Sequence, residues 1–94
     1  MRQLTPTEQR EILDKLKNFL KTISVVDKEK VVVESIFLAT GDGGTTIPPY
    51  LKDKVEQMAN IIKEIPFTEK KNKQFCDMML VLIKEIKEEK LLEQ

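Results

Sequence analysis

Histidine and tryptophan are absent from this sequence, and cysteine and tyrosine each occur once among its 94 residues. Histidine is the side chain that most often acts as a general base or metal ligand near neutral pH, so its absence removes the commonest routes to catalysis. The single cysteine, Cys76, can form no disulfide within the chain and has no histidine to activate it as a nucleophile. We therefore expect a protein that is not an enzyme and holds no metal or cofactor, with Cys76 as a small buried hydrophobic residue.

Long apolar runs and an excess of either charge are also missing. The longest apolar run, from Met78 to Ile83, has six residues, whereas about 20 are needed to span a bilayer. Sixteen basic and sixteen acidic residues cancel, although a general nucleic-acid-binding protein needs a basic surface. The sequence therefore predicts a chain that neither spans a membrane nor binds nucleic acids in general. A lone cysteine is typical of reducing compartments, which makes the cytoplasm the expected location.

The residues that are abundant indicate helices. A chain of 94 residues can build one modest hydrophobic core, so we expect a single domain over residues 1–94. Apolar residues recur at helical spacing in four segments, near 6–23, 27–40, 49–65 and 68–92. Short connections between such helices favour an all-α fold, a compact antiparallel four-helix bundle.

The first of these helices has a complete start signal. Thr5 is expected at the N-cap, Pro6 at the first helical position, and Glu8 completes a capping box. The apolar stripe that follows consists of Ile12, Leu13, Leu16, Phe19, Leu20 and Ile23. The lysines of this segment, Lys17 and Lys21 among them, fall outside the stripe and are expected to point away from the core.

The second segment is ambiguous, because the run from Val31 to Val33 has the β-branched side chains that strands favour. No alternating pattern elsewhere offers a partner strand, and a single strand cannot satisfy its own backbone, so a helix is the better prediction. Asp27 is the expected cap. Few polar positions follow Glu34, so this helix is expected either to be the most buried or to lie against another subunit.

The third and fourth helices are separated by Pro66 and Thr68, which are expected to end one helix and to cap the next. The apolar stripe of the third helix is Leu51, Val55, Met58, Ile62 and Ile65. In the fourth helix, the run from Met78 to Ile83 makes almost the whole circumference apolar. A helix that is apolar all round must be buried all round, so we expect the chain to form a homo-oligomer.

The longest connection, residues 41–47, contains every glycine of the chain. A glycine-rich loop that leads into a helix offers backbone N–H groups to an anion, and the hydroxyls of neighbouring threonines can add to them. The first interpretation to weigh is that these glycines only end one helix and form a turn, and alone the loop favours this one. As a ligand site, the sequence predicts Gly41, Gly43, Gly44, Thr45, Thr46, Tyr50 and Lys54.

Within this site, Tyr50 is predicted to stack on a base or sugar, or else to cover the loop, and Lys54 to supply a positive charge. The function that follows is the binding of a phosphate-bearing small molecule, for example a cyclic nucleotide. In this respect the chain resembles small phage-encoded helical proteins that sequester cyclic nucleotides.

A protein-interaction module is the alternative function. Pro49-Tyr50-Leu51 opens the third helix, and Ile65-Pro66-Phe67-Thr68 leads into a long fourth helix. This order of helices, over roughly residues 6–90, is similar to the antiparallel bundles of bacteriocin immunity proteins, from which the longer glycine loop and the charged C-terminus depart. The resemblance implies a protein partner instead of a small ligand. A phage or host regulator that docks on a larger protein would use the same surfaces.

Overall fold

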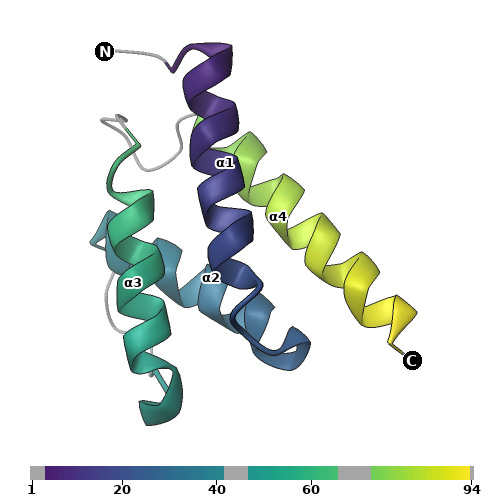
Figure 1. Ribbon diagram of the computed structural model, residues 1–94. Coiled ribbons are helices and arrows are strands. Elements are labelled where there is room, and N and C mark those ends of the chain that lie inside the picture. The colour runs from purple at the N-terminus through teal and green to yellow at the C-terminus, as the bar shows by residue number, and fades with distance from the viewer. Residues whose placement is uncertain (1–3, 42–46, 66–72, 94) are drawn as a thin grey trace.

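The computed structural model describes residues 4–41, 47–65 and 73–93. The described residues form four α-helices, α1 (Pro6–Leu20), α2 (Val25–Thr40), α3 (Lys52–Ile62) and α4 (Lys73–Leu92), and one short 3₁₀ helix, η1 (Pro49–Leu51). No strand occurs among them, so the predicted all-α class is confirmed. α2 packs against both α3 and α4, while α1 contacts α3 and α4 less extensively. Figure 1 shows α2 crossing behind α1 and α3, and α4 diverging from α1 toward the C-terminus.

One hydrophobic core receives side chains from all of these elements. Its buried members are Leu4, Leu16, Leu20, Ile23, Val31, Val32, Leu51, Val55, Met58, Ile62, Ile65, Phe75, Met78, Met79, Leu82 and Ile86. Cys76 is only partly buried and packs against the edge of this core. The apolar spacing read from the sequence therefore identifies the inward face of each helix.

The capping box of α1 is confirmed. The backbone N–H of Glu8 donates to Thr5 Oγ1 at 3.1 Å, and the N–H of Thr5 donates to Glu8 Oε1 at 3.1 Å. α1 ends at Leu20, earlier than the predicted residue 23. The N–H of Lys21 donates to the carbonyls of both Lys17 and Asn18, and those of Thr22 and Ile23 donate to carbonyls three positions back. The last turn is thus tightened into 3₁₀ geometry, which keeps the apolar spacing but ends the α-helix.

The second segment is a helix and not a strand, as predicted, but it starts at Val25 instead of Asp27. Ser24 occupies the N-cap position, and the N–H groups of Asp27 and Lys28 both donate to its carbonyl oxygen. Asp27 lies instead in the first turn, where its carboxylate accepts the Ser24 hydroxyl at 3.0 Å. A negative side chain is favourable in that turn because of the helix dipole.

The third predicted helix is divided into η1 and α3, and its last residues again follow 3₁₀ geometry, with Ile65 donating to Ile62. The predicted boundaries at Pro66 and Thr68 lie outside the described residues. At the other end of the core, Gln74 of α4 binds both backbone groups of Leu4 at 2.9 Å. The start of α1 is therefore tied to the start of α4.

Apolar residues also reach the surface of α2 and α4. Val26 is 76% exposed, Val33 37% and Phe37 36% on α2, while Leu80 is 64% exposed on α4. The apolar run of α4 is thus divided, with Met78, Met79 and Leu82 in the core and Leu80 outside it. In the part of the chain that the structure describes, no helix combines the length and apolarity that a bilayer requires.

Candidate functional site

Of the predicted ligand residues, Gly41, Tyr50 and Lys54 are described, whereas Gly43, Gly44, Thr45 and Thr46 lie outside the described residues. Gly41 ends α2 with φ +79°, and its N–H donates to the carbonyl of Phe37. This is the left-handed backbone conformation that glycine adopts most easily at the end of a helix. The loop therefore starts as the sequence predicts, with Gly41 closing α2.

Tyr50 and Lys54 lie one helical turn apart, and both reach the corner between α1 and α2. The Tyr50 hydroxyl donates to Asp27 Oδ1 at 3.1 Å. The Lys54 ammonium donates to Thr22 Oγ1 at 3.4 Å and lies 5.8 Å from the centre of the Phe19 ring. The hydrogen bond to Asp27, together with smaller effects of desolvation and of the Asp27 charge, raises the pKa of Tyr50.

This corner is distant from the start of the glycine loop. Asp27 and Gly41 are separated by fourteen positions of α2, which corresponds to about 21 Å along the helix axis. The hydroxyl of Tyr50 is therefore held near the beginning of α2, whereas Gly41 lies at its end. The structure brings Tyr50 and Lys54 together but does not bring them to Gly41, and their roles in ligand binding stay predictions.

A cleft elsewhere in the molecule gathers more charged groups. It opens between α1, the first turn of α2 and the C-terminal half of α4, and it has a volume of about 420 Å³. Small-molecule sites typically have about 300–1,000 Å³. The residues that line it are Asp14, Lys17, Asn18, Leu20, Lys21, Lys28, Leu82, Glu85, Ile86 and Glu89.

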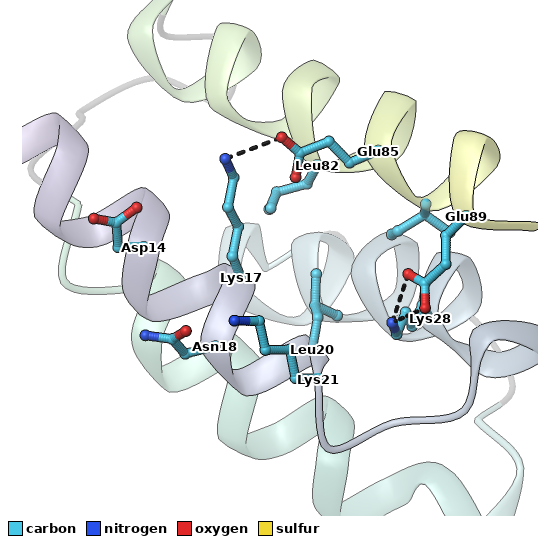
Figure 2. A pocket seen from close by; sticks show the side chains of 10 residues that line it. Asp14, Lys17, Asn18, Leu20, Lys21, Lys28, Leu82, Glu85 and Glu89 are labelled. Atoms are coloured by element: carbon cyan, nitrogen blue, oxygen red, sulfur yellow. Dashed lines mark hydrogen bonds and ion pairs between the residues drawn. The ribbon is translucent and has the colours of Figure 1, made fainter.

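Two ion pairs cross this cleft to neighbouring turns of α4 (Figure 2). Lys17 Nζ is 3.0 Å from Glu85, and Lys28 Nζ is 2.7 Å from both carboxylate oxygens of Glu89. The side chains of the first pair are 32% and 49% exposed, whereas that of Lys28 is only 10% exposed. Exposed pairs contribute about 0.2–1 kcal/mol. The Lys28 pair, which joins α2 to α4, is better shielded and doubly hydrogen-bonded, so it is the stronger of the two pairs.

Lys21 completes the basic side of the cleft. Among the described residues, no hydrogen bond or ion pair involves its ammonium group. Leu20, Leu82 and Ile86 form the apolar floor, because each is almost completely buried yet borders the cleft. The cleft thus combines an apolar floor with a free cation and a second cation, that of Lys17, in an exposed ion pair.

Sequence reasoning missed this cleft. Lys17 and Lys21 are four positions apart on α1, a spacing that places them on the same side of a helix. That signal is visible in the sequence, but it is equally typical of a solvated helix face. The missing information is the crossing of α1 and α4, which brings Glu85 to Lys17 across 68 positions of sequence.

Within residues 4–41, 47–65 and 73–93, no three histidine, cysteine, aspartate or glutamate side chains lie close enough together to share a metal ion. Comparisons of the chain with protein-family models, with curated proteins and with solved structures find no match. The functional interpretation therefore depends on the chemistry of the described surface alone.

Proposed function

We propose that this chain is a non-enzymatic binding protein that sequesters a phosphate-bearing small molecule, such as a cyclic nucleotide, in the cleft between α1 and α4. The observation that supports this function best is that Lys17 and Lys21 line one cleft with an apolar floor. Lysine gives phosphate charge-assisted hydrogen bonds, which are about twice as strong as neutral ones. The base or sugar of the ligand would cover the floor.

The carboxylates of the cleft determine which cations a ligand can use. Glu89 holds Lys28 with two contacts of 2.7 Å in a shielded position, so this lysine stabilises the fold and is not expected to contact the ligand. Glu85 holds Lys17 only in an exposed pair, which a phosphate can replace at a cost of about 0.2–1 kcal/mol. Among the described residues, Lys21 has no partner to give up. Lys17 and Lys21 therefore supply the phosphate contacts.

The loop residues Gly43, Gly44, Thr45 and Thr46 remain a second predicted location for the same class of ligand. Their backbone N–H groups and hydroxyls would bind phosphate without a lysine. Because the loop and the cleft use different residues, variants can separate them.

Isothermal titration calorimetry of the full chain against inorganic phosphate, AMP, cyclic AMP and a cyclic dinucleotide tests the proposal. For a nucleotide that binds, Lys21→Gln is expected to weaken affinity about tenfold, the loss of one charge-assisted hydrogen bond. Lys63→Gln, which neutralises an exposed lysine at the end of α3, is the matched control and should change little. Gly44→Val with Thr45→Ala should affect binding only if the loop is the site.

The proposal is contradicted if none of these compounds binds or raises the melting temperature. A ligand at 100 times its Kd stabilises the folded state by about 2.7 kcal/mol, which a thermal shift measures easily. If Lys21→Gln and Lys63→Gln weakened nucleotide affinity equally, the cleft would be excluded as the binding site. General electrostatic attraction would then explain the binding.

A protein-interaction module is the second candidate function, supported by the exposed apolar side chains. Val26 and Phe37 of α2 and Leu80 of α4 resemble the residues that protein interfaces bury. These residues lie outside the cleft lining, so the two functions use different surfaces. Substitution of Leu80 by aspartate would abolish binding of a protein partner on α4 while leaving nucleotide binding unchanged.

A further inference from the structure

The outward face of α2 carries a stripe formed by Val26, Lys30, Val33 and Phe37. Their offsets of 0, 4, 7 and 11 repeat along one side of a helix. All four side chains are exposed, and Val26 is 76% exposed. The opposite side of α2 contributes Val31 and Val32 to the core, so this helix is apolar on two faces.

We infer that the stripe is a self-association surface whose occupant is a second copy of this chain, with the two α2 helices antiparallel around a two-fold axis. The stripe is self-complementary in that orientation. With Val26 placed opposite Phe37 of the second copy, Lys30 falls opposite Val33 of the second copy, because both pairs of residue numbers have the same sum. The same contacts then recur in reverse, as a two-fold interface requires.

The charges beside the stripe fit this arrangement. Lys30 and Glu34 lie one turn apart on the same flank of α2, and in an antiparallel pair equal flanks face each other. Lys30 therefore approaches Glu34 of the second copy, and the reverse pair forms by symmetry. Within the described residues of one chain, neither Lys30 nor the partly exposed Glu34 forms an ion pair. Both groups gain a partner of opposite charge in the dimer.

The size of the surface determines the affinity to expect. An interface made by one face of a helix with 16 residues is expected to bury less than the ~800 Å² per partner that stable complexes usually bury. The aromatic ring of Phe37 is the main apolar contact, and Lys30 interrupts the apolar stripe between Val26 and Val33. We therefore expect a reversible dimer with a micromolar Kd, which responds to changes in protein concentration.

Sedimentation equilibrium of the full chain over a range of concentrations tests the inference. The wild-type protein should show a monomer–dimer equilibrium, and Phe37→Asp should be a monomer throughout. Leu80→Asp, which adds the same charge at an exposed apolar position of α4, is the matched control and should dimerise like the wild type. Circular dichroism should show equal helicity for all three proteins.

Charge reversal tests the orientation. Lys30→Glu and Glu34→Lys should each raise the dimer Kd about tenfold, because each turns two attractive pairs into repulsive ones. The double variant restores opposite charges, so its Kd should return close to the wild-type value. A wild-type chain that remains monomeric, a dimer broken by Leu80→Asp but not by Phe37→Asp, or a double variant as weak as the single ones would each overturn the inference.

Discussion

The ion pair between Lys28 and Glu89 gives the most quantitative prediction of the structure. The two residues join α2 to α4 across 61 positions, and the Lys28 side chain is only 10% exposed. Glu89→Ala would leave the ammonium group of Lys28 shielded from water and without its anion. We expect a loss of about 2 kcal/mol in the free energy of unfolding, because a hydrogen bond to a charged group is worth about 1.5–3 kcal/mol and Glu89 is partly exposed.

Removing the other partner of the pair, Lys28, should lower the free energy of unfolding by less. Lys28→Met replaces the buried cation by an apolar chain of similar length, while Glu89, whose side chain is 43% exposed, can return to water. The double variant should therefore be about as stable as Lys28→Met alone, which gives a coupling energy of about 1–2 kcal/mol between the two residues. The same cycle with Lys17→Met and Glu85→Ala is the matched control and should give about 0.2–1 kcal/mol.

Urea unfolding of the four proteins of each cycle measures these energies. For a domain of 60–100 residues, 1 kcal/mol corresponds to a shift of about 4–8 °C in the melting temperature, so thermal unfolding provides an independent check. Added salt should reduce the coupling of Lys17 with Glu85 more than that of Lys28 with Glu89, since screening acts mainly on exposed charges. Equal couplings in the two cycles would refute the assignment of Lys28 to a shielded structural role.

Three further predictions concern single sites. Thr5→Ala removes the oxygen that accepts the Glu8 N–H and should destabilise the protein by about 1 kcal/mol, measured by urea unfolding. Gly41→Ala should lower the free energy of unfolding by about 1 kcal/mol, because alanine is strained at φ +79°. An added Cβ meets no atom within 4 Å, so a much larger loss would reveal an unrecognised contact. Tyr50 is the only tyrosine, and its raised pKa predicts that tyrosinate absorbance appears at higher pH in the folded chain than in urea, whereas Asp27→Ala should remove the difference. The stability contributed by this contact is therefore fully present below the unfolded pKa of about 10 and is lost as the pH rises through the higher pKa of the folded chain.

The fold was largely predictable because the apolar periodicity identifies which face of each helix is inward. Leu16 and Leu20 of the first stripe are buried, as are Val55, Met58 and Ile62 of the third. The helix ends were less predictable, because the 3₁₀ turns keep apolar side chains inward after the α-helix has ended. Capping also misled the prediction for α2, where Ser24 and Asp27 both favour a helix start and only their backbone conformations distinguish them.

The candidate site was predictable only in its components. Lys17 and Lys21 are visible on one side of the first helix, but a single helix does not reveal what lies opposite. Lys28 shows this limit best, since its spacing places a cation on the inward face of α2, where it lies at 8% exposure. Its partner Glu89 is an ordinary member of a charged tail in the sequence. Only the packing of α4 on α2 turns these residues into a cleft.

The valine run of α2 gave an ambiguous pattern because its residues lie on two different faces of the helix. Successive residues of a helix point about 100° apart, so three consecutive valines cannot share one face. Val31 and Val32 are completely buried, whereas Val33 is 37% exposed beside Phe37. The core accounts for the first two and leaves Val33 and Phe37 unexplained within one chain. A second copy against the outward face would bury both, and the valine run that made α2 resemble a strand would then belong to a helix with two apolar contacts.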